Sequence, residues 1–200
     1  MQTQPRRRRS KNFESIVEQA LPEAARGKPL EVWFQDEARV GQQGTLTRIW
    51  ARRGTRPRAP RDTRHKWGYI FGAACPGRGT AAGLVLPYVN AEAMELHLAE
   101  IAKTVASGAH ALLILDGAGW HGAKRLKIPP NITLLKLPPY APELNPMENV
   151  WAYLRANKLA ITVFDSYDDI LDKCADAWNF FANDPGRIMS ITQRDWIKVK

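Results

Sequence analysis

Three acidic residues lie where chemistry on a phosphate ester could be placed. Asp36 follows a short apolar run, Asp116 directly follows the most apolar run of the chain, and Glu148 falls in a predicted helix start. Three carboxylates at one site repel each other unless divalent cations neutralise them. Mg²⁺ prefers oxygen ligands, and two such ions can clamp the attacking and leaving oxygens of a phosphodiester. The three residues together are typical of metal-dependent phosphoryl transfer.

Each carboxylate also has a purely structural interpretation. Asp36 lies in a run of charged residues that can be an exposed turn. Asp116 precedes a glycine and can cap the segment that follows. Glu148 falls at the third position of a helix that Asn145 would cap, where a glutamate completes the capping interaction. The catalytic interpretation therefore depends on all three residues facing one crevice.

The sequence does not carry the residue patterns of a zinc site, a disulfide scaffold or a Ser-His-Asp triad. The four histidines are scattered, Cys75 and Cys174 lie far apart, and no Ser-His-Asp order is visible. This spacing excludes a zinc site or a disulfide scaffold and favours a reducing compartment. His121 lies five residues after Asp116, so it either lines the same pocket or has a surface or packing role. Asn145 is a second candidate to line the pocket.

The hydrophobic pattern predicts an α/β sheet of mixed direction. Leu30–Phe34 predicts a first strand, and Asp36 lies two residues past its end. Ala111–Leu115 predicts a central strand that is covered on both faces and ends at Asp116. Because ligands of such sheets bind at the carboxyl ends of central strands, both aspartates are well placed. Three further strands are predicted before the first long helix and form an antiparallel meander with the first strand: Thr45–Arg52, Lys66–Ala74 and Ala81–Val89. A last strand, Ile132–Leu137, follows the central strand.

Helical spacing marks the remaining segments. Asn12–Arg26 predicts a helix in a basic leader, residues 1–29, and residues 30–200 form one domain. Further helices are predicted to open at Asn90 and at Asn145 and to span Tyr167–Phe181, and the segment from Asp184 has the pattern of a short, mixed tail.

The formal net charge of +9 is concentrated in the first third of the chain. Residues 1–66 hold 16 Lys and Arg against 7 Asp and Glu, and residues 67–200 hold 13 of each. This predicts a polyanionic partner, most simply nucleic acid, against the alternative of an ordinary solvated surface with a basic tail. Trp50 and Trp67 flank a basic, proline-rich loop and serve either packing or base stacking. The predicted DNA contacts, made to phosphates rather than bases, are Arg48, Arg52, Arg53, Arg56, Arg58, Arg61, Arg64 and Lys66.

Composition excludes several classes of protein. The 44% hydrophobic content argues against a disordered chain. No run approaches the roughly 18 consecutive apolar residues of a membrane helix. The basic N-terminus has no apolar stretch behind it, so it is not a secretory signal.

Three segments resemble a known family. Trp33–Arg39, Leu115–His121 and Leu137–Trp151 are similar to segments of the DDE transposases of bacterial insertion sequences, in the mariner-like superfamily. The third is the most specific, because a Pro-Tyr-Ala-Pro loop runs into a Leu-Asn-Pro-x-Glu helix start. The resemblance covers roughly residues 30–197.

The resemblance implies a ribonuclease H-like fold, with a mixed five-stranded sheet flanked by helices. It implies that Asp36 bridges two Mg²⁺ ions, of which Asp116 and Glu148 each hold one, and that Mn²⁺ can substitute. Glu143 is a rival for the third position, but the family pattern places the catalytic residue after the Asn-Pro pair. The 31 residues between Asp116 and Glu148 are close to the separation in the family.

The implied activity is hydrolysis of a phosphodiester at a transposon end, followed by attack of the freed 3′-OH on target DNA, usually at TA. The implied partners are double-stranded DNA and a second copy, in an active homodimer. Family members read transposon ends with an N-terminal helix-turn-helix region, for which residues 1–29 are too short. We therefore expect a separate helix-turn-helix partner or an upstream reading frame, and a place in the bacterial cytoplasm at the nucleoid.

Two alternatives remain at this point. The chain could be an inactive DNA-binding remnant of a transposase that lacks the end-recognition domain. It could also be a different ribonuclease H-like nuclease, such as a junction resolvase.

Overall fold

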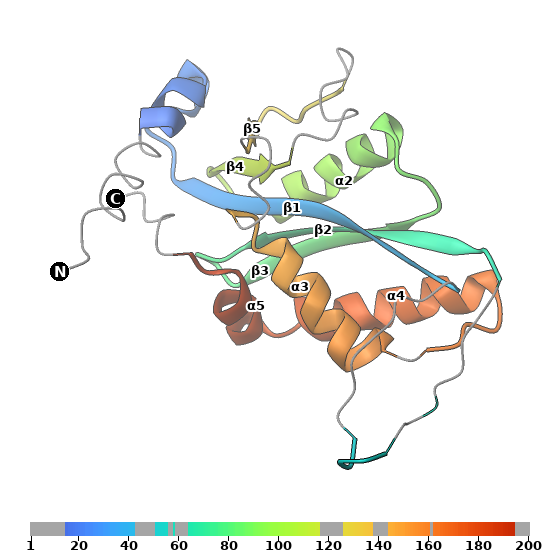
Figure 1. The fold of residues 1–200 in the computed structure, drawn as a ribbon. Coiled ribbons are helices and arrows are strands. Elements are labelled where there is room, and N and C mark those ends of the chain that lie inside the picture. Colours follow the sequence, from blue (N-terminus) through green and yellow to red (C-terminus); the bar gives the residue numbers. More distant parts are fainter. Residues whose placement is uncertain are drawn as a thin grey trace.

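The fold is a mixed sheet with helices on both faces (Figure 1). It was obtained as a computed structural model. The residues that it describes are 15–42, 51–55, 58, 64–116, 126–137, 144–160 and 162–194.

Five strands form the sheet: β1 (Leu30–Gly41), β2 (Trp67–Cys75), β3 (Thr80–Leu86), β4 (His110–Leu115) and β5 (Ile132–Lys136). They lie side by side in the order β3-β2-β1-β4-β5. β1, β2 and β3 form an antiparallel meander of three strands where four were predicted, and β4 and β5 run parallel to β1. The mixed five-stranded sheet is therefore confirmed, with β1 at its centre.

β1 is longer than predicted. The prediction ended the strand at Phe34, but β1 continues to Gly41, so Asp36 lies within the strand and not beyond its end. The physical reason is alternation: Ala38 and Val40 extend the apolar face of the strand, and polar residues point the other way between them. The charged residues after Asp36 therefore belong to a strand with two different faces and not to a turn.

The prediction of a strand over Thr45–Arg52 is wrong for its last two residues. Ala51 and Arg52 lie outside any strand, and residues 43–50 lie outside the described part of the chain. The residue that pairs with the end of β1 is instead Trp67, at the start of β2.

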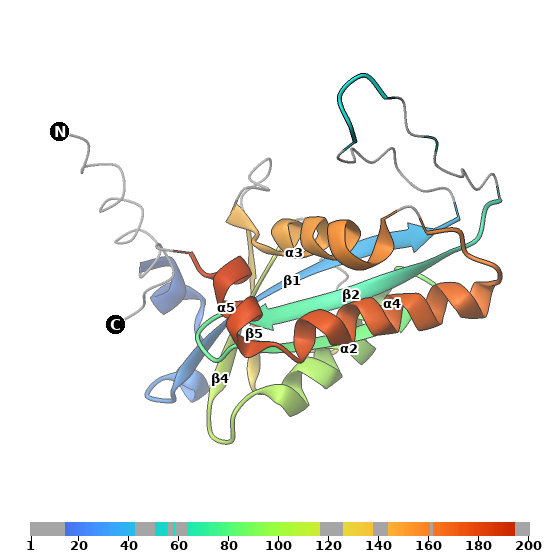
Figure 2. The same cartoon turned by 90° about the horizontal axis from the view of Figure 1, so that it is seen from below.

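In the described part of the chain, the main helices cover both faces of the sheet (Figures 1 and 2). They are α2 (Ala91–Thr104) on the first face, and α3 (Met147–Leu154), α4 (Tyr167–Ala182) and α5 (Pro185–Thr192) on the second. α3 continues into a π-helical turn, Arg155–Leu159.

The helix α5 was not predicted. Its signal is present in the sequence, because Asp184 accepts a hydrogen bond from the backbone N–H of Arg187 at 2.8 Å and Pro185 stands at the first helical position. Both are preferred residues for a helix start. The prediction of a mixed tail from Asp184 is therefore wrong.

The two faces of the sheet contribute to two core clusters. Phe34 of β1 and Ile114 of β4 pack under α3 and α4, whereas Trp33 and Leu113 pack under α2. Since successive side chains of a strand point to opposite faces, this alternation decides to which face a functional side chain belongs.

Part of the predicted leader helix is described. Residues 15–20 are helical, and a 3-10 turn, Glu23–Ala25, follows. Val17 is buried in the core cluster under α3 and α4, so this helix packs on the domain. No helix in the described part of the chain is both long and apolar enough to cross a membrane.

Candidate active site

Each of the three predicted carboxylates is positioned by a different element. Asp36 lies in the middle of β1, Asp116 is the first residue after β4, and Glu148 lies in the first turn of α3. Asp36 is half-buried, and the other two residues are exposed. The site therefore depends on how β4 and α3 are attached to β1.

The strands β1 and β4 bring the two aspartates to adjacent positions. Phe34 pairs with Ile114 in the parallel register, and Asp36 and Asp116 each follow two residues later. Phe34 and Ile114 both point into the cluster under α3, so the period of two directs Asp36 to that face, and Asp116 leaves β4 beside it. Neighbouring strands lie only about 4.8 Å apart.

The helix α3 is tied to Asp36 by a tryptophan. The indole Nε1 of Trp151 donates a hydrogen bond to Oδ2 of Asp36 at 2.8 Å. Trp151 follows Glu148 by three residues, so the two side chains are neighbours on the helix surface. Among the causes that raise the pKa of Asp36 is the charge of Glu148, which is consistent with this placement.

Gly72 of β2 provides the space for this contact. Gly72 pairs with Asp36 in the antiparallel register. A Cβ atom at this position would lie 2.7 Å from the ring of Trp151 and 2.6 Å from the ring of Trp178. The absence of a side chain at Gly72 therefore lets both indoles lie close to the backbone of β2.

Asn145 fastens the start of α3 to β1. Its Nδ2 donates to the backbone carbonyl of Gln35 at 3.0 Å, and its Oδ1 accepts from the backbone N–H of Met147 at 3.1 Å. The predicted position of Glu148, third in a helix capped by Asn145, is wrong, because the helix starts at Met147 and Glu148 is its second residue. The buried Asn145 orients α3 beside Asp36.

Burial raises the pKa of Asp36 from 3.8 to about 7. Hydrogen bonds from Trp151 and from the backbone of Glu37 lower it, and the charges of Glu37 and Glu148 raise it further. Ionising a carboxylate in such surroundings is unfavourable unless a cation is near. The electrostatics around Asp36 therefore favour a positively charged ligand.

The donor atoms fit a hard divalent cation. Asp36, Asp116 and Glu148 offer only carboxylate oxygens, which Mg²⁺ prefers. Within the described residues, no three His, Cys, Asp or Glu side chains are grouped closely enough to hold a metal ion on their own. Mg²⁺ usually keeps water molecules and substrate phosphates among its ligands, so one or two protein carboxylates for each ion are sufficient. His121 lies outside the described part of the chain.

The predicted DNA contacts divide into three groups. Arg52, Arg53, Arg58 and Lys66 are exposed. Arg64 donates to the backbone carbonyls of Phe164 and Asp165 and so links the end of the loop to the start of α4. The predicted contacts that lie outside the described residues are Arg48, Arg56 and Arg61.

Two residues that build the site were not predicted. Trp151 could have been found from its spacing, because a residue three positions after Glu148 is its neighbour on a helix. Gly72 could have been found as a glycine inside an apolar strand, which often marks a close approach of another group.

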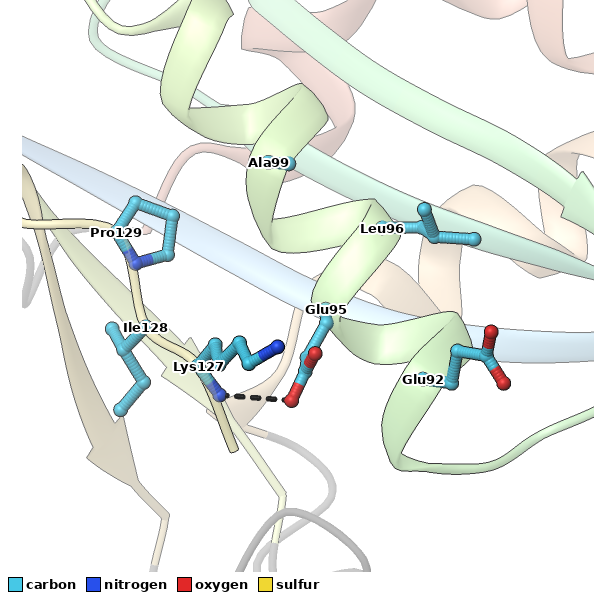
Figure 3. A pocket seen from close by; sticks show the side chains of 7 residues that line it. All are labelled: Glu92, Glu95, Leu96, Ala99, Lys127, Ile128 and Pro129. Carbon is cyan, nitrogen blue, oxygen red and sulfur yellow. Dashed lines mark hydrogen bonds between the residues drawn. The ribbon is translucent and has the colours of Figure 1, made fainter. Parts of the chain in front are cut away.

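A hollow between α2 and the segment that enters β5 lies on the other side of the sheet (Figure 3). Glu95 of α2 accepts a hydrogen bond from the backbone N–H of Lys127 at 3.0 Å, which holds this segment to the helix. The walls combine Glu92 and Glu95 with the apolar side chains of Leu96 and Ile128. Since the three carboxylates are not among its lining residues, this hollow is separate from the candidate active site.

The fold is a ribonuclease H-like fold, with a mixed five-stranded sheet flanked by helices. Asp36 lies in its central strand, Asp116 follows the parallel neighbour β4, and Glu148 lies in α3. The model of the family described as DDE superfamily endonuclease matches residues 31–171. The chain belongs to this family, which confirms the resemblance to DDE enzymes.

The chain is also similar to a bacterial protein in sequence and to solved structures in fold. An uncharacterized protein of Sinorhizobium fredii (strain NBRC 101917 / NGR234), y4pE/y4sA, is 58% identical over 130 residues, which are 65% of this chain and 96% of that protein. Among solved structures, the pre-cleavage Mos1 transpososome matches with a TM-score of 0.60 at 16% identity, over 95% of this chain and 59% of that chain. The Mos1 mariner paired end complex with Mn matches with a TM-score of 0.59 at 16% identity, over 96% of this chain and 60% of that chain. The chain thus spans about three fifths of the length of these Mos1 chains and shares their fold.

Proposed function

We propose that the chain is the catalytic domain of a DNA transposase, which hydrolyses a phosphodiester at a transposon end and transfers the freed strand to target DNA. The observation that carries the proposal is the attachment of α3 to Asp36 through Trp151, which brings the helix that carries Glu148 to a half-buried carboxylate in the central strand. Family membership supports the endonuclease chemistry. The Mos1 structures, which include a strand transfer complex, support the transposase assignment.

Asp36, Asp116 and Glu148 would hold the two divalent ions, with Mg²⁺ as the physiological metal and Mn²⁺ as a substitute. Mos1 paired end complexes with Mn and with Mg have been solved. Bound cations at this site would neutralise developing charge on the phosphate and promote attack by water or by a 3′-OH. The chain's own contribution is to orient two of the carboxylates: Trp151 fixes one oxygen of Asp36, and Asn145 fixes the helix that carries Glu148.

The partner is double-stranded DNA, as transposon end and as target, with TA as the expected target step. The exposed cations Arg52, Arg53, Arg58 and Lys66 support binding to the phosphate backbone. End recognition is assigned to a separate helix-turn-helix region or partner. The active form is proposed to be a homodimer, located at the nucleoid of the bacterial cytoplasm.

Nicking of supercoiled plasmid DNA tests the proposal. The wild-type chain should convert supercoiled DNA to open circles in Mg²⁺ or Mn²⁺ and not in EDTA, and Asp116→Asn should abolish the conversion. Because Asp116 is exposed, this variant should keep the fold. Joining of a 3′-OH oligonucleotide to the plasmid would distinguish a transposase from a resolvase.

The outcomes separate the alternatives. DNA binding without metal-dependent nicking by the wild type would favour the inactive remnant. Nicking that survives in Asp116→Asn would show that the carboxylates are assigned wrongly or that a contaminating nuclease is present, which a second variant, Glu148→Gln, would resolve.

A further inference from the structure

A second hollow, of about 520 Å³, lies at the end of the sheet where β1 ends and β2 begins. Its walls carry aromatic rings from three parts of the chain together with a cation: His65, Lys66, Trp67, Tyr69, Tyr88 and Tyr167. We call it the aromatic pocket. None of the three candidate catalytic carboxylates lines it.

The pairing of β1 with β2 builds one wall. Trp67 and Tyr69 are alternate residues of β2, so their rings lie on the same face of the sheet. Trp67 pairs with Gly41, where a Cβ atom would lie 2.3 Å from the carbonyl oxygen of Lys66 and 2.8 Å from the Cα of Trp67. A glycine at this position therefore allows β2 to start where it does.

Cationic and imidazole groups contact this wall. The guanidinium carbon of Arg39 lies 4.7 Å from the centre of the Trp67 ring. The ring of His65 meets Trp67 edge to face, with 6.2 Å between ring centres. The exposed Lys66 lies between the two aromatic residues in sequence. The wall is thus aromatic and positively charged at once.

Two tyrosines form the other wall. Tyr88 comes from the loop between β3 and α2, and Tyr167 is the first residue of α4. Both rings line the same hollow. Burial raises the pKa of the Tyr167 hydroxyl, and the Tyr88 phenol and the Asp168 carboxylate add to the rise. Tyr88 is nevertheless 70% exposed. Its ring contributes little to the core and is available to a ligand.

We propose that the aromatic pocket binds one unpaired nucleobase of a DNA strand by stacking. Aromatic side chains stack on any base, and cations beside them hold the flanking phosphates. The proposal rests on the proposed function only in taking DNA as the partner. Gly41 lies five residues along β1 from Asp36, or roughly 17 Å at about 3.4 Å per residue. Because this separation is odd, Trp67 and Tyr69 lie on the opposite face of the sheet from Asp36, so the base would be held away from the candidate active site.

The test compares two duplexes that differ in one nucleotide. One carries a single bulged 2-aminopurine, and the other carries an abasic nucleotide at the same position. Both are titrated with the full chain in EDTA, so that the result is independent of cleavage. We expect the base-bearing duplex to bind about fivefold tighter or better, with quenching of 2-aminopurine emission on binding.

Variants connect the preference to the pocket. Tyr88→Ala should reduce the preference to about one, and Tyr88→Phe should retain it because the ring remains. Phe180→Ala removes another exposed aromatic ring, on α4, and should leave the preference unchanged. Melting temperatures of the variants verify that each is folded.

Each result decides the matter. Equal affinity of the wild type for both duplexes overturns the pocket, and salt-dependent binding of both would leave the proposed DNA partner intact. A preference that persists in Tyr88→Ala also overturns the pocket. Failure to bind either duplex at low salt overturns the DNA partner as well.

Discussion

The indole of Trp151 and the carboxylate of Asp36 join the first turns of α3 to the middle of β1 through one hydrogen bond of 2.8 Å. The bond holds one oxygen of a carboxylate that burial already makes difficult to ionise. An oriented and desolvated carboxylate is well prepared to accept a cation, because little reorganisation is needed when the cation arrives. The same bond fixes the helix that carries Glu148.

Replacing Trp151 by Phe keeps an aromatic ring and removes the hydrogen bond. Partners of metal ligands typically contribute 10- to 100-fold to metal affinity or activity. We therefore expect plasmid nicking to fall by about 10- to 100-fold and half-saturation to need more Mn²⁺. Stability should fall by about 1 kcal/mol, as for loss of one hydrogen bond. Trp178→Phe is the matched control, since Trp178 lies in the same cluster and its ring centre is 6.0 Å from that of Trp151. An equal loss of activity in both variants would contradict a specific role for the bond.

The raised pKa of Asp36 predicts how stability depends on pH in EDTA. The folded pKa of about 7 lies above the unfolded value of 3.8, so the folded state holds a proton that the unfolded state has lost. Stability should be greatest below pH 4 as far as Asp36 is concerned, and its contribution should be lost as pH rises towards 7, by at most ~1.4 kcal/mol per pH unit. Urea unfolding of the wild type and of Asp36→Asn across this range measures the difference. Parallel pH profiles for the two proteins would show that Asp36 is not the titrating group.

Gly72→Ala tests the space beneath the two indoles. A methyl group at this position would meet the rings of Trp151 and Trp178 at 2.7 and 2.6 Å, so at least one ring must move. We expect a loss of about 1–3 kcal/mol, as in overpacked cores, and a fall in nicking as Trp151 leaves Asp36. Gly68→Ala on the same strand is the control, because its Cβ would make only an ordinary contact, 3.4 Å from Leu171. Stability and nicking that remain at wild-type levels in Gly72→Ala would mean that the rings shift without cost.

The existence of the five strands could be predicted because each carries an apolar or β-branched run, whereas their order in the sheet was not predicted. After His110, β4 is an uninterrupted apolar run, and all six of its residues are buried. The length of β1 could not be predicted from its first half, because polar residues prevail from Gln35 onwards, and only Ala38 and Val40 are apolar between Phe34 and Gly41. Only the pairing with β2, which runs from Phe34 to Gly41, shows that the charged stretch is strand.

The three carboxylates of the candidate site are a prediction from the sequence, and of the residues that support them only Asn145 was among the predicted site residues. The types and positions of Asp36, Asp116 and Glu148 can be read along the chain, since each follows or opens a predicted element. The contact of Trp151 with Asp36 joins residues far apart in sequence and depends on the packing of α3 across β1 and β2. Such contacts follow from tertiary structure and have no local pattern.

The salt dependence of DNA binding tests the exposed cations directly. Each phosphate contact contributes about 0.9 to the slope of log affinity against log salt. The double variant Arg52→Ala, Arg53→Ala should therefore reduce the slope by roughly 1.8. Lys103→Ala, on α2 at the opposite face from the carboxylates, should leave it unchanged.

Arg64→Ala should behave differently from both, because Arg64 is bonded to carbonyl groups ahead of α4. We expect it to lower the melting temperature and to change the slope little. Fluorescence anisotropy of a labelled duplex between 50 and 200 mM salt, about the range over which such contacts act, gives the slopes. If the double variant kept the wild-type slope, the phosphate contacts would have to lie elsewhere on the protein. The basic segment before residue 67 would then account for the net charge and not for the affinity.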